Sequence, residues 1–149
     1  MGKHILHIFI LAILIPASVI SAEWVLVGTV NQPGMQPSIS AADRNIVWIV
    51  GGSSQAPKIF RSVNRGVDWS PVSTTGITYE LYCVWGFNDQ TCFVGEGEVN
   101  GGASLFRTNN GGTTWNVIFT TPPNRGYFNG LGFTKYNNNL FGLAIAERI

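Results

Sequence analysis

The sequence predicts an all-β fold of the β-propeller type, in which four-stranded antiparallel sheets repeat along the chain. Three observations predict this fold class. Charged residues make up only 11% of the 149 residues, while 18 Gly and 12% aromatic residues favour strands joined by tight turns. Short apolar runs alternate with turn residues along most of the chain. One pattern also occurs twice, at a spacing typical of propellers and other repeat folds.

The first 22 residues have the three-part layout of a secretory signal peptide. Lys3 precedes an apolar run over Ile5–Ile15, and the small residues of Pro16–Ala22 follow it. The run is shorter than the roughly 20 apolar residues that cross a bilayer. We therefore expect cleavage after Ala22 and a secreted, periplasmic or cell-envelope protein that meets a membrane only during export. An uncleaved N-terminal anchor or a buried strand is the alternative.

Composition excludes several classes of partner and chemistry. A net charge of +1 predicts no binding to nucleic acid or to an anionic membrane surface. The 45% of hydrophobic residues, with 5 Trp and 9 Phe, can form a core and exclude disorder. Both histidines, His4 and His7, lie in the leader, so residues 23–149 lack a Ser-His-Asp triad. We expect no metal and no cofactor.

Two cysteines lie on either side of a turn-like stretch. If a hairpin is centred between Phe87 and Asn88, Cys83 and Cys92 lie opposite each other. Cross-strand neighbours approach the distance that a disulfide requires, so a Cys83–Cys92 disulfide is possible in an exported protein. Two buried free thiols are the alternative.

The repeated pattern is apolar-Phe-Arg-[Ser/Thr]-x-Asn-x-Gly-x-x-Trp, found in residues 59–69 and 105–115. Upstream, residues 47–51 match residues 91–95 at an offset of 44, against 46 for the pattern, which implies two inserted residues. We interpret each copy as a hairpin corner, in which Asn bonds to backbone, Gly adopts a positive φ and Trp packs over the turn. The structural residues are then Ser62, Asn64, Gly66 and Trp69, with Thr108, Asn110, Gly112 and Trp115.

Residues 62–69 and 108–115 resemble the Asp-box, or bacterial neuraminidase repeat. This repeat occurs in the propellers of sialidases, sortilin-type receptors, xyloglucan-cleaving glycosidases and photosystem II assembly factors. Both copies have Asn where the family prefers Asp. The resemblance implies that each box joins the third and fourth strands of a propeller blade, on the rim away from the ligand face, in a structural role.

The strand patterns divide residues 23–149 into about two and a half blades. We expect strands at 37–41, 46–51, 58–63 and 67–73, then at 78–86, 91–95, 104–108 and 113–120, and finally at 127–134 and 140–145. Residues 23–27 resemble the last strand of a blade. A closed ring takes about 4–8 blades, so the sequence predicts an incomplete ring. A fragment of a larger propeller, a ring of several short chains and a small open sheet protein are the explanations, and open sheet edges favour self-association.

The resemblance implies that ligands bind to the loops that join strands two and three and successive blades. The polar candidates on these loops are Glu96, Glu98, Asn100, Arg125 and Tyr127, with Glu147 at the matching place in the third repeat. Glu96 and Glu98 could supply acid–base groups, but two positions apart in an extended stretch they share one face. The alternative interpretation of these carboxylates is that they are solvated loop charges. The alternative for Tyr127 is that its ring packs in the core.

The function that the sequence favours is an exported binding or scaffold module for a protein or glycan partner. No catalytic residue is expected in this reading. The alternative is a fragment of a secreted glycoside hydrolase, sialidase-like or xyloglucanase-like. A second alternative is a propeller of the photosystem assembly-factor type, which acts on a membrane complex.

Overall fold

The computed structural model describes residues 26–30, 34, 37–97, 102–123, 126–137 and 139–147, with backbone alone at 135, 136, 140 and 147. The expected signal peptide lies outside these residues. Within them, the regular secondary structure consists of β-strands, and no helix is long and apolar enough to span a membrane.

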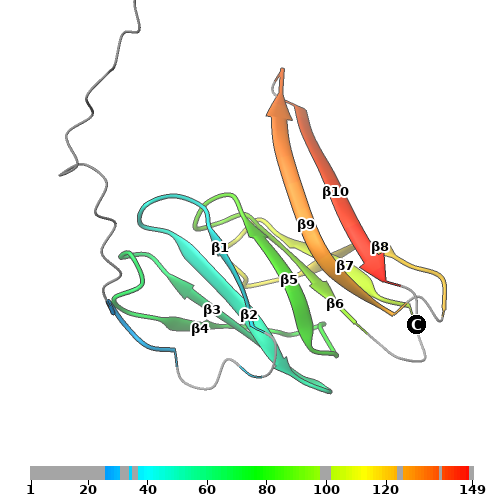
Figure 1. Ribbon diagram of the computed structural model, residues 1–149, viewed down its shortest axis with the longest axis horizontal. Coiled ribbons are helices and arrows are strands. Elements are labelled where there is room, and N and C mark those ends of the chain that lie inside the picture. Colours follow the sequence, from blue (N-terminus) through cyan, green and yellow to red (C-terminus); the bar gives the residue numbers. More distant parts are fainter. Residues whose placement is uncertain are drawn as a thin grey trace, which may run out of the picture.

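The strands form two four-stranded antiparallel sheets and a hairpin, each in chain order (Figure 1). The first sheet contains β1 (Ser38–Ala41), β2 (Val47–Ser53), β3 (Ala56–Ser62) and β4 (Ser70–Val72). The second contains β5 (Leu81–Gly86), β6 (Cys92–Glu96), β7 (Ser104–Thr108) and β8 (Asn116–Thr120). The hairpin consists of β9 (Tyr127–Tyr136) and β10 (Asn139–Glu147). The predicted all-β class and the four-stranded antiparallel sheets are confirmed, because each predicted strand from residue 37 onward overlaps an observed one.

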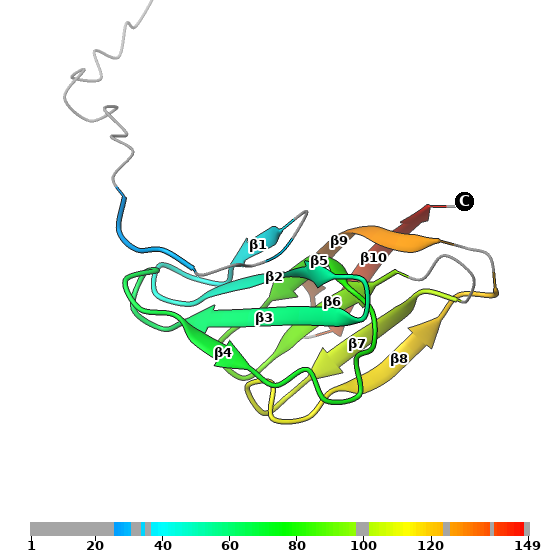
Figure 2. The same cartoon turned by 90° about the horizontal axis from the view of Figure 1, so that it is seen from below.

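The two sheets and the hairpin lie side by side in chain order (Figures 1 and 2). The first strands of neighbouring units are adjacent, since β5 contacts both β1 and β9. One buried apolar cluster lies between the first and second sheets and includes Trp48, Val50, Ile59, Val84, Val94 and Phe106. A second cluster joins the second sheet to the hairpin and contains Cys83, Ala103, Leu105 and Phe128, with Leu131 packed against it. Burial of such side chains stabilises a fold by about 1.5–3 kcal/mol each.

Polar contacts also cross the junction between the first and second sheets. The Trp48 indole N–H donates to the Asn88 carbonyl in the β5–β6 turn (2.9 Å). The Arg61 guanidinium donates to the Gly111 carbonyl in the β7–β8 turn (3.1 Å). These bonds fix the position of the first sheet relative to the second, because both acceptors are backbone groups in tight turns.

The strand register relates the two sheets residue by residue. Trp48 lies opposite Arg61, and Phe93 lies opposite Arg107. Each guanidinium covers the ring opposite it, at 5.2 Å for Trp48 and 5.4 Å for Phe93. Equivalent residues of β2 and β6 are therefore 45 positions apart, as Trp48 and Phe93 are. The predicted offset of 44 is wrong by one residue, and one residue is inserted before the repeated pattern.

The hairpin register that would place Cys83 opposite Cys92, on which the possible disulfide depended, is wrong. Cys83 lies opposite Gly95, and Cys92 lies opposite Gly86, because the β5–β6 turn is centred on Asp89. Residues opposite each other share a face of the sheet, so the two thiols point to opposite faces. Cys92 belongs to the cluster against the first sheet and Cys83 to the cluster against the hairpin. Both thiols are free and buried, which was the alternative.

Candidate ligand-binding site

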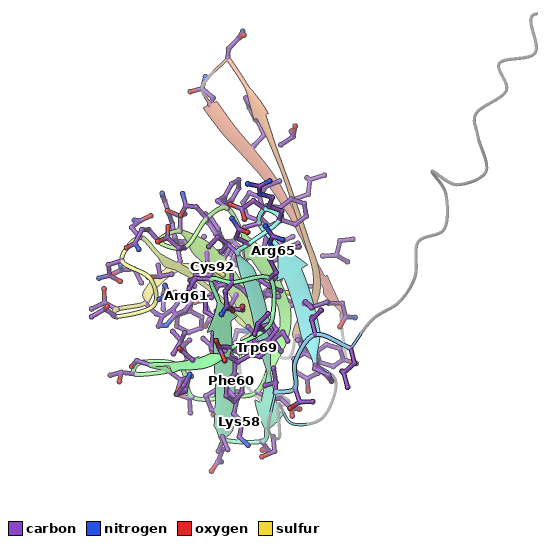
Figure 3. The ribbon with its side chains drawn as sticks, turned by 90° about the vertical axis from the view of Figure 1, so that its left-hand side faces the viewer. Lys58, Phe60, Arg61, Arg65, Trp69 and Cys92 are labelled. Atoms are coloured by element: carbon purple, nitrogen blue, oxygen red, sulfur yellow. The ribbon has the colours of Figure 1, made fainter. Side chains whose placement is uncertain are left out.

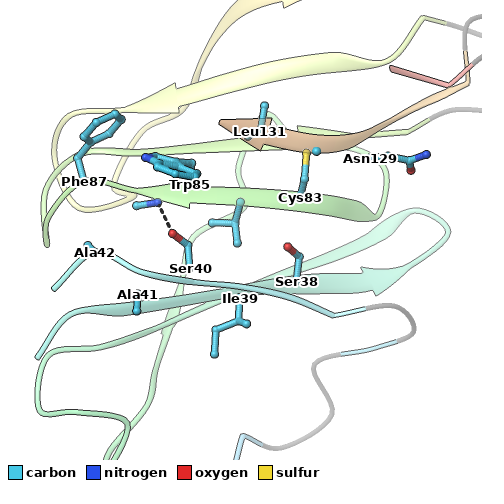
Figure 4. Close-up of a pocket in the computed structure, with 13 residues that line it drawn as sticks. Ser38, Ile39, Ser40, Ala41, Ala42, Cys83, Trp85, Phe87, Asn129 and Leu131 are labelled. Carbon is cyan, nitrogen blue, oxygen red and sulfur yellow. Dashed lines mark hydrogen bonds between the residues drawn. The ribbon is translucent and has the colours of Figure 1, made fainter. Parts of the chain in front are cut away.

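A hollow of about 580 Å³ opens along the first strands of the two sheets and the hairpin (Figure 4). Strands β1, β5 and β9 each supply part of its wall, so it exists only because these strands are adjacent. Side chains with polar or aromatic groups in the lining are Ser38, Ser40, Trp85, Phe87 and Asn129. A pocket of this size and composition is typical of a small-ligand site.

The hydroxyls of the hollow come from one face of β1. Ser38 and Ser40 are two positions apart on this strand and therefore share a face, and both are half-buried. The Ser40 hydroxyl accepts a hydrogen bond from the Gly86 backbone N–H at the end of β5 (3.0 Å). This bond positions β1 against β5 and leaves the hydroxyl proton of Ser40 available as a donor.

The chemistry of the lining is neutral. The Cys83 thiol forms part of the wall, and burial raises its pKa to about 12. It stays protonated at neutral pH, and a protonated thiol is a poor nucleophile and a poor metal ligand. None of the described residues that line the hollow is charged at neutral pH. The described lining therefore consists of neutral hydroxyl, thiol, amide, aromatic and aliphatic groups.

Three of the six predicted ligand-face residues, Glu96, Tyr127 and Glu147, lie in the described part of the chain. Glu98, Asn100 and Arg125 lie outside the described residues. Glu96 is the last residue of β6, and the next residue, Gly97, forms a bridge with Tyr127. The backbone of Glu147 pairs with that of Tyr127 as well. The three described residues of this set therefore lie at the same end of the sheets.

Glu96 is a buried carboxylate and not a solvated loop charge. Its side chain is only 5% exposed. The carboxylate accepts hydrogen bonds from the backbone N–H groups of Thr78 (3.3 Å) and Tyr79 (3.2 Å). It thereby fastens the segment before β5 to the end of β6. We assign Glu96 a structural role, since an acid–base group needs a free face toward substrate.

Tyr127 packs against the second sheet. Its ring stacks on that of Tyr82, with centroids 4.6 Å apart and an interplanar angle of 17°. The Tyr82 hydroxyl donates to the Glu80 carboxylate. Burial and this hydrogen bond raise the pKa of Tyr82 to about 12, so the phenol is protonated at neutral pH. One face of the Tyr127 ring is therefore covered by Tyr82.

The predicted hairpin corners occupy the β3–β4 and β7–β8 turns. The Gly66 N–H donates to the Ser62 hydroxyl (2.8 Å), and the Gly112 N–H donates to the Thr108 hydroxyl (2.9 Å). Gly66 has a φ of 81° and Gly112 a φ of 85°, a conformation that favours glycine. Both hydroxyl residues are buried, at 1% and 0% exposure. In each turn the buried hydroxyl therefore holds the glycine backbone in place, which is a structural role.

The asparagines of the two turns make matching bonds. The Asn64 side-chain carbonyl accepts from the Asp68 N–H (2.9 Å), as that of Asn110 accepts from the Thr114 N–H (3.0 Å). The side-chain amides differ in what they bind. Asn64 donates to the Asp68 carboxylate (2.8 Å), whereas Asn110 donates to the Thr114 hydroxyl (2.9 Å).

The tryptophans of the two turns differ more. The Trp69 indole donates to Gly66 of its own turn (2.9 Å). The Trp115 indole instead donates to the Ser73 carbonyl, just after β4 of the first sheet (2.8 Å). We expected each Trp to seal its own hairpin. Trp115 also ties the second sheet to the first.

Within the described part of the chain, no three His, Cys, Asp or Glu side chains gather as a metal site would require. No family model, curated protein or solved structure matches the chain. The interpretation of the site therefore depends on the chemistry of its own residues.

The lining residues of the hollow were not among the predicted candidates. The prediction concentrated on loop residues, whereas Ser38, Trp85 and Asn129 lie on strands. A signal was present in Ser38–Ala41, where small polar residues alternate with Ile39 and Ala41 in an expected first strand. Such alternation indicates one face toward polar surroundings.

Proposed function

We propose that this chain is an exported, β-propeller-type binding module that holds an uncharged glycan in the hollow along β1, β5 and β9. The lining of the hollow carries the proposal. It combines hydroxyl, amide and aromatic groups with no charge, which suits sugar hydroxyls and the apolar faces of sugar rings. Export rests on the expected signal peptide.

The propeller interpretation is supported by three features of the described residues. The two sheets have the same strand order, their third and fourth strands are joined by turns with matching hydrogen bonds, and their first strands are adjacent. In a propeller the first strands of the blades surround the central axis, so the hollow would be an arc of the central channel. The turns then serve as scaffold on the opposite rim.

The glycoside hydrolase alternative has less support. A glycosidase places two carboxyl groups on either side of the scissile bond. None of the described residues that line the hollow carries a carboxylate, and the Glu96 carboxylate accepts hydrogen bonds from two backbone N–H groups. A sialidase-like substrate would also need cations for its own carboxylate. Nothing in residues 37–97 or in the other described segments favours an assembly-factor role.

Binding to defined oligosaccharides tests the proposal. The chain would be screened against neutral xylo-, cello- and manno-oligosaccharides and against sialylated glycans, followed by calorimetry with the best neutral ligand. We expect neutral sugars to bind and sialylated ones to bind no better. Asn129→Ala removes an exposed amide of the lining and should weaken binding by about tenfold, the effect of one lost hydrogen bond.

Asn109→Ala is the matched control, because Asn109 is equally an exposed asparagine but lies in the β7–β8 turn. It should leave the affinity unchanged. Failure of every neutral oligosaccharide to bind, or equal losses for the two variants, would refute the glycan proposal. If a protein partner competes for the hollow, the proposed ligand would be a protein and not a glycan.

A further inference from the structure

The junctions between neighbouring units join two different faces. We call the face of a sheet or hairpin that looks to the next unit along the chain its leading face, and the opposite one its trailing face. The leading face of the first sheet carries Trp48, Val50 and Ile59, and it packs on the trailing face of the second, with Val84, Val94 and Phe106. The leading face of the second sheet packs on the trailing face of the hairpin in the same way. The rings of Phe93 and Phe133 are in contact there, with their centroids 4.5 Å apart.

Among the residues that the structure describes, no other sheet covers the trailing face of the first sheet. Its central row is Ile39, Ile49, Phe60 and Pro71, which lie opposite one another across the four strands. In the second sheet the equivalent row is Val84, Val94, Phe106 and Val117, and its first three residues are buried against the first sheet. Ile39 is 66% exposed. Figure 3 views the molecule from the side of the first sheet, where Phe60 is labelled.

No described strand packs on the leading face of the hairpin either. On β10 it presents Phe141, Leu143 and Ile145, which are 54%, 79% and 67% exposed. On β9 the residues opposite them include Gly130 and Gly132, and a Cβ at either glycine would meet no atom within 4 Å. The three apolar side chains therefore border an open strip over β9. Contiguous exposed apolar surface of this kind marks an interaction site.

We infer that copies of this chain stack head to tail, with the leading face of the hairpin of one copy on the trailing face of the first sheet of the next. The occupant is argued from the molecule itself, because both internal junctions pair a leading with a trailing face, and the two faces that no described residue packs on as a further sheet are one of each kind. Such a contact is heterologous, so copies add in one direction and form rings or open chains. The inference does not depend on the ligand of the hollow.

The test is the mass of the chain in solution, with material recovered from an exporting host that carries the full sequence. Analytical ultracentrifugation should show oligomers larger than dimers that dissociate on dilution. Leu143→Glu places a charge on the leading face of the hairpin, and Ile39→Glu places one on the trailing face of the first sheet. Each variant alone should associate at least about tenfold more weakly, because a buried unpaired charge opposes docking.

A mixture of the two variants separates this arrangement from other kinds of association. Each variant keeps one intact face, so an equal mixture should form a one-to-one dimer that does not grow. Pairing of two β10 edges would instead be insensitive to Ile39→Glu. Val63→Glu is the control, since Val63 is 55% exposed but lies in the β3–β4 turn, and it should associate like the unaltered chain.

A monomer at every concentration would overturn the inference. So would a mixture that stays monomeric, or a loss of association caused by Leu143→Glu but not by Ile39→Glu. Circular dichroism of each variant establishes that the strands have formed before its mass is interpreted.

Discussion

At the scale of single residues, the asparagines of the two turns differ in what their side-chain amides bind. Asn64 donates its amide to the Asp68 carboxylate, a bond that only an amide can make. Asn110 donates to the Thr114 hydroxyl, which can reverse its role and donate to a carboxylate. The first turn therefore requires Asn because of its neighbour, and the second accepts either residue.

This difference predicts opposite outcomes for the same substitution. Asn64→Asp should lower the free energy of unfolding by about 1 kcal/mol, because it loses a hydrogen bond and places two carboxylates together at an exposed site. Asn110→Asp should change it by less than about 0.5 kcal/mol. Urea denaturation at neutral pH and low salt measures both. Restoring the stability of Asn64→Asp with Asp68→Thr would establish the cause, and equal effects at the two turns would contradict it.

At the scale of the elements, Trp115 connects two sheets, whereas Trp69 closes one turn. Trp115 is 9% exposed, belongs to the cluster between the sheets and donates to Ser73 beyond β4. Trp69 is half-buried and donates within its own turn. The two residues are equivalent in sequence, and their difference comes from the presence of a sheet before the second one.

We therefore expect Trp115→Ala to cost about 3–5 kcal/mol of unfolding free energy, as for a buried large aromatic residue. Trp69→Ala should cost about 1–3 kcal/mol, because less of its ring is removed from water. Chemical denaturation of both variants measures the difference. A larger loss for Trp69→Ala would show that the turns, and not the contact between sheets, limit the stability.

The sequence predicted the strands well because their signals are local. Short apolar runs alternate with turn residues, among them Gly, Asn and Asp, from residue 37 onward, and the observed strands overlap the predicted ones. Register was predicted less well, since moving the β5–β6 turn to Asp89 separates Cys83 from Cys92 onto opposite faces. The hollow could not be predicted from loops, because it depends on how three distant strands lie together. Glu96 looked like a loop charge, and its burial depends on the backbone of Thr78 and Tyr79.

At the scale of the whole molecule, each of the two thiols lies in one junction between neighbouring units, so its reactivity measures how often that junction opens. Cys92 is buried against the first sheet, and Cys83 is buried against the hairpin. Burial raises the pKa of both thiols, that of Cys83 from 9.0 to about 12. Folding thus favours the neutral thiol. This part of the stability is complete below the ordinary thiol pKa, and it is lost as the pH rises from there toward about 12.

Labelling with a disulfide reagent at about pH 8 should therefore be slow in the folded chain and fast in denaturant. The thiolate fraction of Cys83 falls about a thousandfold when its pKa rises from 9.0 to about 12, and closure of the sheets adds to that protection. The variants Cys83→Ala and Cys92→Ala leave one thiol each. The labelling rate of each variant therefore reports the opening of one junction separately. If the hairpin detaches before the sheets separate, the thiol at position 83 reacts first, and equal rates mean that the molecule opens as one unit. Reaction of either thiol in the folded chain at the rate of an unfolded one would contradict the buried, free state of these cysteines.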